Sequence, residues 1–316
     1  MISLNAYSLA YSMGLLRKKN MRSWKLIDFI KFCKNKKIDF LEFPIDYFSN
    51  KEKTSLKKIF LILEKEKIQP IIDLENINLN VIKQLVHLNK EFKFDLIRIK
   101  MSNYFGGNRH EIRDFDKTKR NFVINIKKIL KIIKKTSLQI AIENHQDLTS
   151  KEIIKIIKST SVEKVGVNWD MGNSLATAEI PEKFFENVKK YIFNVHSKDY
   201  RVVRSSEGFF LKRCIIGKGI IDFKKFIKFF KKKGINLSVE LGAHYSRHCK
   251  LNNPAFLKAH EIDNKRLSTF NEYLNQISVQ ENPFTDWEIF KDEKNCYAEE
   301  IKDVNKSIEF IKKLYV

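Results

Sequence analysis

The chain has 316 residues, of which 43% are hydrophobic and 31% are charged. This balance is typical of a folded globular protein and excludes fibrous and fully disordered classes. A single β/α barrel uses about 200 to more than 400 residues, so one domain accounts for the length. No apolar run reaches the roughly 18 residues of a membrane span, and the first residues lack the basic and apolar regions of a secretory signal. We therefore expect a cytoplasmic protein without a membrane segment.

The formal net charge of +22 raises the question of nucleic-acid binding, because clustered Lys and Arg supply most of the non-specific affinity for phosphate backbones. Lysines far outnumber arginines, however, and most of them interrupt helical apolar patterns instead of forming one block. We interpret the charge as a solvated lysine surface. Nucleic acid is therefore not the expected partner.

Taken in chain order, short β-branched runs alternate with amphipathic helical stretches nearly to residue 240. This alternation is typical of repeated β-α units around a parallel sheet. Between the strands, apolar residues recur at helical spacing, for example from Leu26 to Cys33 and from Phe122 to Ile133. The eight expected strands are residues 2–8, 39–43, 70–74, 96–100, 139–143, 164–170, 192–196 and 236–240.

The number of strands and the helix boundary signals favour a closed barrel. Thr149 with Glu152 forms a capping box, Asp222 is a helix N-cap, and Gly234 ends a helix before the last strand. An open doubly wound sheet usually has fewer strands, and no Gly-x-Gly-x-x-Gly motif opens the first helix. We therefore predict an α/β fold, a single (β/α)8 TIM barrel over residues 1–242, with a C-terminal helical extension over 243–316 packed on it.

Three segments interrupt the alternation: residues 101–117, residues 197–221 and the tail from 241 onward. All three follow the carboxyl ends of strands, where a β/α barrel carries its active site, so long loops there favour an enzyme. The basic residues of 197–221 either attract an anionic substrate, such as a sugar acid or sugar phosphate, or form a solvated loop. The tail contains two helical patterns and is a candidate contact for a homo-oligomer.

The last four expected strands each end in a side chain that can bind a metal. Burial of three carboxylates together is electrostatically unfavourable without a cation, so we predict a divalent metal site here. Three carboxylates and one imidazole suit Mn²⁺ or Mg²⁺, and Co²⁺ or Zn²⁺ can substitute. Glu42 and Asp73, which end the second and third strands, are interpreted as structural carboxylates. The predicted metal ligands are Glu143, Asp170, His196 and Glu240.

Short motifs surround these strand ends: Ala-Ile-Glu143-Asn-His145, Asp170-Met-Gly172-Asn173, Val-His196-Ser-Lys198-Asp199, Gly217-Lys-Gly219-Ile-Ile-Asp222 and Val-Glu240. Together they resemble the xylose-isomerase-like barrel superfamily of sugar isomerases and epimerases, over residues 1–242. The resemblance implies that the four strand-end residues hold the metal and that Glu143 and Glu240 are the catalytic residues that move protons.

A cation that binds a substrate carbonyl and its neighbouring hydroxyl acidifies the adjacent C–H and stabilises an enediolate. The resemblance implies that Glu143 and Glu240 lie on opposite faces of the substrate, so that one removes a proton and the other returns one. The expected function is therefore the divalent-metal-dependent isomerisation or epimerisation of a keto sugar or sugar derivative.

Other functions remain open at this point. The pattern from Glu143 to Asp147, with Gly208-Phe209 and Arg213, resembles enzymes of oxidised branched sugars and implies a metal-dependent decarboxylase or lyase of an oxo sugar acid, similar to 3-oxo-isoapionate decarboxylase. Abasic-site DNA endonucleases share the barrel, but their three metals need more histidines, and Asn173 stands where one of these would be. A non-catalytic binding protein is the remaining alternative.

Four residues are expected to contact the substrate: His145, Asn173, Lys198 and Arg213. His145 follows a predicted ligand closely, so it either contacts the substrate or buttresses the site. Asn173 occupies a position where ketose epimerases often carry a substrate-contacting His. Lys198 either binds a substrate oxygen or carboxylate, or forms a surface pair with Asp199.

Overall fold

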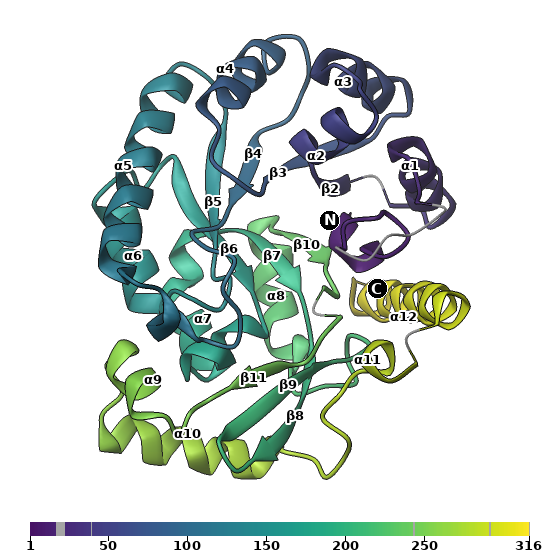
Figure 1. Ribbon diagram of the computed structural model, residues 1–316. Coiled ribbons are helices and arrows are strands. Elements are labelled where there is room, and N and C mark those ends of the chain that lie inside the picture. Colours follow the sequence, from purple (N-terminus) through teal and green to yellow (C-terminus); the bar gives the residue numbers. More distant parts are fainter. Residues whose placement is uncertain (17–22, 39, 243, 291, 316) are drawn as a thin grey trace.

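The computed structural model describes residues 1–16, 23–38, 40–242, 244–290 and 292–315. Within these ranges eight parallel strands form a closed barrel in the order β1-β10-β7-β6-β5-β4-β3-β2, with helices around it (Figure 1). The predicted (β/α)8 barrel is therefore confirmed. The barrel strands are β1 (Ile2–Asn5), β2 (Phe40–Pro44), β3 (Gln69–Leu74), β4 (Leu96–Ile99), β5 (Gln139–Glu143), β6 (Val165–Asp170), β7 (Ile192–Ser197) and β10 (Asn236–Val239).

The helices around the barrel begin and end where the sequence signals place them. Thr149 and Glu152 form the reciprocal capping box, Asp222 accepts a hydrogen bond from the Lys224 N–H at 3.2 Å, and Gly234 ends its helix at a φ of 64°. These helices are α1 (Leu26–Asn35), α2 (Ile45–Lys51), α3 (Leu56–Lys65), α4 (Leu79–Leu88), α5 (Phe115–Ile133), α6 (Ser150–Lys158), α7 (Pro181–Val188) and α8 (Phe223–Lys233), with short 3-10 turns η1 (Ala6–Leu9), η2 (Arg109–Glu111), η3 (Asn173–Thr177) and η4 (Lys189–Tyr191).

Several strand boundaries differ from the predicted ones by one to three residues. The first strand ends at Asn5, because the Asn5 side chain accepts a hydrogen bond from the Tyr7 N–H at 2.8 Å and starts η1. Residue 39, the predicted start of the second strand, lies outside the described residues. The last barrel strand ends at Val239, so Glu240 is the first residue beyond it.

The segment 197–221 was expected to be a loop, and this expectation is wrong. It contains an antiparallel hairpin of β8 (Tyr200–Ser205) and β9 (Gly208–Arg213), which β11 (Arg247–Cys249) extends to a three-stranded sheet beside the barrel (Figure 1). The hairpin forms because alternate apolar residues on one face are buried against α10 (Asn264–Ile277). The buried residues of this second core include Tyr200, Val202, Phe209, Leu211, Phe270 and Leu274.

The tail contributes to two different cores. Its helix α10 covers the small sheet, whereas α12 (Glu293–Tyr315) lies beside the N-terminal segment and buries Val304, Ile308 and Ile311 in the barrel's main core (Figure 1). The remaining helices are α9 (Pro254–Ala259) and α11 (Asp286–Phe290). Residue 243, the predicted start of the extension, lies outside the described residues. Among the described helices, none is both long enough and apolar enough to cross a membrane.

The buried carboxylate of Glu300 in α12 fixes the segment that follows β1. Its two oxygens accept hydrogen bonds from the Tyr11 N–H at 2.8 Å, the Ser12 N–H at 2.9 Å and the Ser12 hydroxyl at 2.6 Å. We predict that Glu300→Ala lowers the free energy of unfolding by about 3 kcal/mol, because the acceptor of three buried donors is lost. Urea denaturation measures this difference.

The matched control is Glu299→Ala, one residue earlier in the same helix. Glu299 is partly exposed, and its only ion pair within the described residues is with Lys302, at 3.0 Å, so its loss should change stability by less than about 0.5 kcal/mol. Equal effects of the two substitutions would contradict a role for α12 in fixing the N-terminal segment.

Candidate active site

Four neighbouring strands bring the predicted metal ligands to one end of the barrel. Strands β5, β6, β7 and β10 are consecutive around the barrel, and Asp170 of β6 is in register with His196 of β7. Glu143 ends β5, and Glu240 directly follows β10. Because parallel strands end at the same rim, these four side chains meet at the carboxyl-terminal mouth, where β/α barrels carry their active sites.

Three of the four residues form a compact group that could hold a metal ion. Glu143, Asp170 and His196 each offer one donor atom, these atoms lie within 4.8 Å of one another, and all three residues are buried. Asp170 Oδ1 and His196 Nδ1 are buried without a hydrogen-bond partner in the described part of the chain. Buried polar atoms without partners are costly, so a cation that both atoms could coordinate fits this group well.

Glu240 lies at the edge of this group. Its Oε2 is 3.8 Å from His196 Nδ1, about as far as the 3.9 Å between His196 Nδ1 and Glu143 Oε2. The same carboxylate also contacts the ammonium group of Lys198. Glu240 therefore lies beside the three-residue group, but its carboxylate is already paired with Lys198.

Glu42, which the sequence analysis interpreted as a structural carboxylate, orients the histidine. Its Oε1 lies 2.8 Å from His196 Nε2, and both side chains are fully buried. An imidazole nitrogen that is held by a carboxylate leaves the other nitrogen, here Nδ1, facing the group of carboxylates. Glu42 is therefore a positioning residue of the site.

Two buried cations were missing from the sequence argument for a metal. Arg98 of β4 contacts the carboxylates of Asp73 and Glu143, and Lys198 Nζ lies 2.6 Å from Asp170 Oδ2. The carboxylates at the mouth therefore have counter-charges on the chain itself, and their burial alone does not require a metal ion. Support for a metal comes instead from the atoms that remain without a partner.

The surroundings of Glu143 and Asp170 shift the pKa values of these two carboxyl groups in opposite directions. Burial raises the pKa of Asp170 to about 7, even though Lys198 opposes this shift. Burial also disfavours the charged form of Glu143, but the positive charge of Arg98, assisted by that of Lys198, outweighs it and holds the pKa of Glu143 well below its usual range. Glu143 is thus held ionised, while Asp170 lacks sufficient positive charge near it.

Lys198 is held in the site by the residue that follows it. The Asp199 carboxylate accepts hydrogen bonds from the backbone N–H groups of Gly217 and Gly219 at 2.9 Å and of Ile221 at 3.1 Å. A side chain on Gly219 would collide with this carboxylate. Of the two alternatives for Lys198, the surface pair with Asp199 is therefore wrong: Asp199 fixes the base of the hairpin, and the buried Lys198 reaches Asp170.

The side-chain amide of Asn173, which was expected to contact the substrate, is hydrogen-bonded to other residues of the site. Its Nδ2 donates to Asp170 Oδ2 at 2.7 Å, and its Oδ1 accepts from Gln146 Nε2 at 2.8 Å and from the Tyr200 hydroxyl at 3.0 Å. Gln146 in turn has a φ of 69° and accepts from the Gly106 N–H at 2.7 Å. This network links the 101–117 segment to Asp170.

His145 is the predicted contact with the clearest access to the mouth. It lines a cavity of about 780 Å³, and its Nδ1 has no hydrogen-bond partner in the described residues. Burial and the charge of Lys100 hold the pKa of His145 well below its usual range, so the ring is neutral. A neutral imidazole can donate a hydrogen bond to a sugar hydroxyl or accept one from it.

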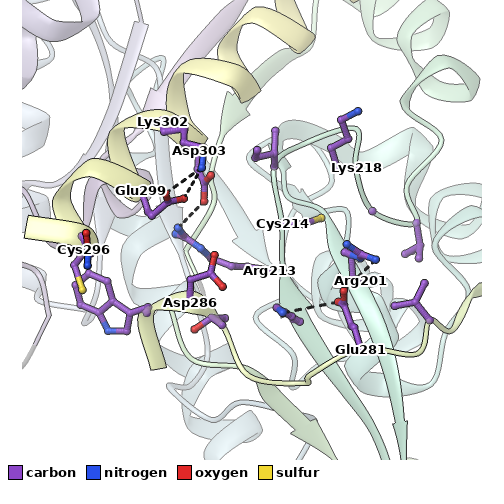
Figure 2. Close-up of a pocket in the computed structure, with 18 of the residues that line it drawn as sticks. Arg201, Arg213, Cys214, Lys218, Glu281, Asp286, Cys296, Glu299, Lys302 and Asp303 are labelled. Carbon is purple, nitrogen blue, oxygen red and sulfur yellow. Dashed lines mark hydrogen bonds and ion pairs between the residues drawn. The ribbon is translucent and has the colours of Figure 1, made fainter. Parts of the chain in front are cut away.

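Arg213 lies outside this cavity, although it was expected to bind substrate. Its guanidinium points to Asp303 of α12, at 3.1 Å, inside a separate pocket of about 610 Å³ between the hairpin and the tail (Figure 2). One nitrogen of Arg213 lies 3.5 Å from Nδ1 of His244, and the ring of His244 lines the cavity at the mouth. The structure therefore places Arg213 behind the wall of the site.

The cavity at the mouth contains further residues that the sequence analysis missed. Lys100 pairs with Glu75 at 2.7 Å, and Arg247 of β11 also lines this cavity, although it lies far from the other lining residues of the barrel strands in the sequence. A signal existed for Arg98, because an arginine between apolar residues of a barrel strand must be buried with partners. No signal existed for Arg247, whose position depends on how β11 joins the hairpin.

These observations define a β/α barrel with a cluster of buried carboxylates and one histidine at the mouth of a cavity that is large enough for a small molecule. The chain belongs to the family described as xylose isomerase-like TIM barrel, which it matches over residues 75–263. The predicted membership is therefore confirmed.

Comparisons with known proteins show similarity in sequence and in structure. The uncharacterized protein YihM of Escherichia coli (strain K12) is 30% identical over 89 residues, which cover 28% of this chain and only 27% of YihM. The probable 3-DHS dehydratase AsbF of Bacillus anthracis superposes with a TM-score of 0.53 at 13% identity, over 87% of this chain and 99% of AsbF.

Two further solved structures are similar to the same extent. The IOLI protein with a bound zinc atom has a TM-score of 0.51 at 14% identity, over 87% of this chain and 97% of its own. A D-tagatose 3-epimerase-like protein has a TM-score of 0.53 at 16% identity, over 86% and 99%. At these identities the likeness establishes the shared fold.

Asn144 holds the strand end that carries Asp170. Its side chain donates to the Asp170 carbonyl at 2.9 Å and accepts from the Asp170 N–H at 2.7 Å, so it continues the ladder between β5 and β6. We predict that Asn144→Ala lowers the free energy of unfolding by about 3 kcal/mol, because two buried backbone groups lose their partners. Urea unfolding measures the change.

Gln139→Ala provides the comparison at the opposite end of β5. Gln139 also bonds to a backbone group, the Glu163 carbonyl, at 3.0 Å, but at an exposed position where water can replace it. Its loss should cost less than about 1 kcal/mol. A larger loss for Gln139 than for Asn144 would refute the assigned role of Asn144.

Proposed function

We propose that this chain is a divalent-metal-dependent enzyme that isomerises or epimerises a keto sugar or sugar derivative. The observation that carries the proposal is the convergence of Glu143, Asp170 and His196, with Asp170 Oδ1 and His196 Nδ1 buried and unpartnered in the described structure. The zinc atom of the IOLI structure supports a metal-dependent enzyme, and the D-tagatose 3-epimerase-like neighbour supports action on a sugar.

Glu143, Asp170 and His196 would hold the metal, with Glu240 as the fourth ligand. Carboxylate and imidazole donors suit Mn²⁺ or Mg²⁺, and Co²⁺ or Zn²⁺ would fit the same donors. When bound, the metal would polarise a substrate carbonyl and make the neighbouring C–H more acidic.

The residues of the chain would do the proton transfers. Glu143 and Glu240 come from the two outer strands of the four, so they flank the middle pair of ligands. One carboxylate would remove a proton from the carbon beside the ketone, and the other would return one. The Lys198 ammonium, which the charges of Asp170 and Glu240 hold at a raised pKa, would donate hydrogen bonds to the oxygen that becomes negative.

A second candidate is a metal-dependent decarboxylase or lyase of an oxo sugar acid. The observation that favours it is the number of cationic side chains around the cavity, which would attract an acid group. These cations are Arg98, Lys100, Lys198 and Arg247.

Metal binding should stabilise the folded protein. We predict that Mn²⁺ or Mg²⁺ at about 100 times its dissociation constant raises the stability of the metal-stripped chain by roughly 2.7 kcal/mol, seen as a rise in Tm of several degrees. Asp170→Asn should remove most of this rise, because it weakens one of the three central donors.

Two further variants define the ligand set. Glu240→Gln should also reduce the rise if Glu240 is a ligand, whereas Glu75→Gln should not, because Glu75 lines the same cavity but pairs with Lys100. If Mn²⁺, Mg²⁺, Co²⁺ and Zn²⁺ all leave the wild-type Tm unchanged, the metal-dependent function is refuted and a binding protein becomes the better explanation.

Proton transfer can be followed without knowing the product. We predict that the metal-loaded protein exchanges the hydrogen beside the ketone of one keto sugar in a panel with solvent deuterium, as measured by NMR. Glu143→Gln and Glu240→Gln should each slow this exchange by a factor on the order of 10² to 10⁴, because each removes an acid-base group.

Glu75→Gln is the matched control and should stay within tenfold of the wild type. Loss of carbon dioxide from oxo sugar acids, without exchange in any keto sugar, would favour the second candidate. Equal exchange rates in the wild type and in both glutamate variants would exclude these carboxylates as the proton carriers.

A further inference from the structure

The cations that line the mouth cavity are not equivalent. Arg98 pairs with Asp73 and Glu143, Lys100 with Glu75, and Lys198 with Asp170 and Glu240. Arg247 also lines this cavity, but no carboxylate of the described residues forms an ion pair with it, and its Nε is buried without a hydrogen-bond partner. One positive charge at the mouth is therefore left without a counter-ion.

The two carboxylates whose charges act on Arg247, those of Glu240 and Glu288, are already engaged by other groups. Glu240 contacts Lys198. Glu288 accepts hydrogen bonds from the Ser246 N–H at 3.0 Å and from the Thr285 N–H at 2.8 Å. An unpaired and largely buried guanidinium is unfavourable in the free protein, which indicates that an anion from outside the chain completes the site.

The guanidinium of Arg247 is held in a defined orientation. Its central carbon lies 3.6 Å from the centre of the Phe105 ring, and the same ring also contacts His145, with ring centres 5.0 Å apart. Stacking on an aromatic face leaves the N–H groups at the edge of the guanidinium free for a two-pronged contact with a carboxylate or phosphate. Phe105 thus connects Arg247 to His145, which lies two residues after Glu143.

We propose that Arg247, stacked on Phe105, is the anion anchor of the site, and that the substrate carries a carboxylate or a phosphate group in addition to its reacting carbons. This inference rests on the proposed function for the nature of the reaction and names the substrate class more closely. Both anions present oxygen pairs that match the guanidinium fork, so the experiment must separate them.

Arg201 and Arg213, two of the basic residues of 197–221, do not take this role. Arg201 pairs with Glu281 at 3.0 Å and Arg213 with Asp303 at 3.1 Å, in the pocket beside the tail (Figure 2). Their charges are neutralised by acidic residues of the C-terminal tail. The anionic substrate that the sequence analysis connected with this segment is thus assigned to a different residue, on β11.

The test compares three sugar-sized probes that differ in their anionic group. D-glucose, D-gluconate and D-glucose 6-phosphate are titrated calorimetrically into metal-free protein, at equal ionic strength in chloride. We expect at least one anionic probe to bind at least tenfold more tightly than D-glucose. Arg247→Met should remove this preference, and Arg247→Lys, which keeps the charge but loses the fork, should keep only part of it.

Arg201→Met is the matched control, since it removes an arginine of the same small sheet that is already paired with Glu281, and it should leave the affinities within twofold. The anion that loses more affinity in Arg247→Met identifies the group as carboxylate or phosphate. If both anionic probes bind no better than D-glucose, or bind Arg247→Met as well as the wild type, the anchor is refuted. Because these titrations contain no metal, their outcome is independent of the metal and exchange experiments that test the proposed function.

Discussion

The structure depends on the burial of a cluster of charges at the carboxyl ends of the barrel strands. Three carboxylates and one imidazole meet there, and each isolated ion would cost several kcal/mol to remove from water. The chain offsets this cost with cations of its own, Arg98 and Lys198, which lie between pairs of carboxylates. The compensation is incomplete at Asp170 and His196, and this local deficit gives the mouth its affinity for a further cation in our proposal.

The surrounding structure holds these charges in place. Asn144 fixes the end of β6 by bonding to both backbone groups of one residue, and Asn173 links the same residue to Gln146 and the 101–117 segment. The hairpin beside the barrel is fixed through Asp199, whose carboxylate binds the backbone of the segment that returns to α8. Polar, buried residues around the site thus determine where the reactive groups lie.

The tail gives the barrel features that the eight β-α units do not contain. Its strand β11 completes the small sheet and carries Arg247 to the mouth, while its helix α12 supplies the acid that neutralises Arg213. The tail therefore affects recognition in two ways, because it adds one cation to the cavity and takes another away from it. Substrate choice in this chain is on this view a property of the tail as much as of the barrel.

The sequence by itself determined the barrel and its candidate ligands. Eight β-branched runs separated by amphipathic helices suffice for a (β/α)8 fold, and parallel strands that end in Glu143, Asp170 and His196 must present them at one rim. Only the tertiary structure decided the counter-charges, the partner of His196 and the place of Arg213 and Arg247. The reason is physical: strand periodicity fixes the rim on which a side chain lies, whereas an ion pair depends on atoms brought together from distant segments, and no local pattern records that contact.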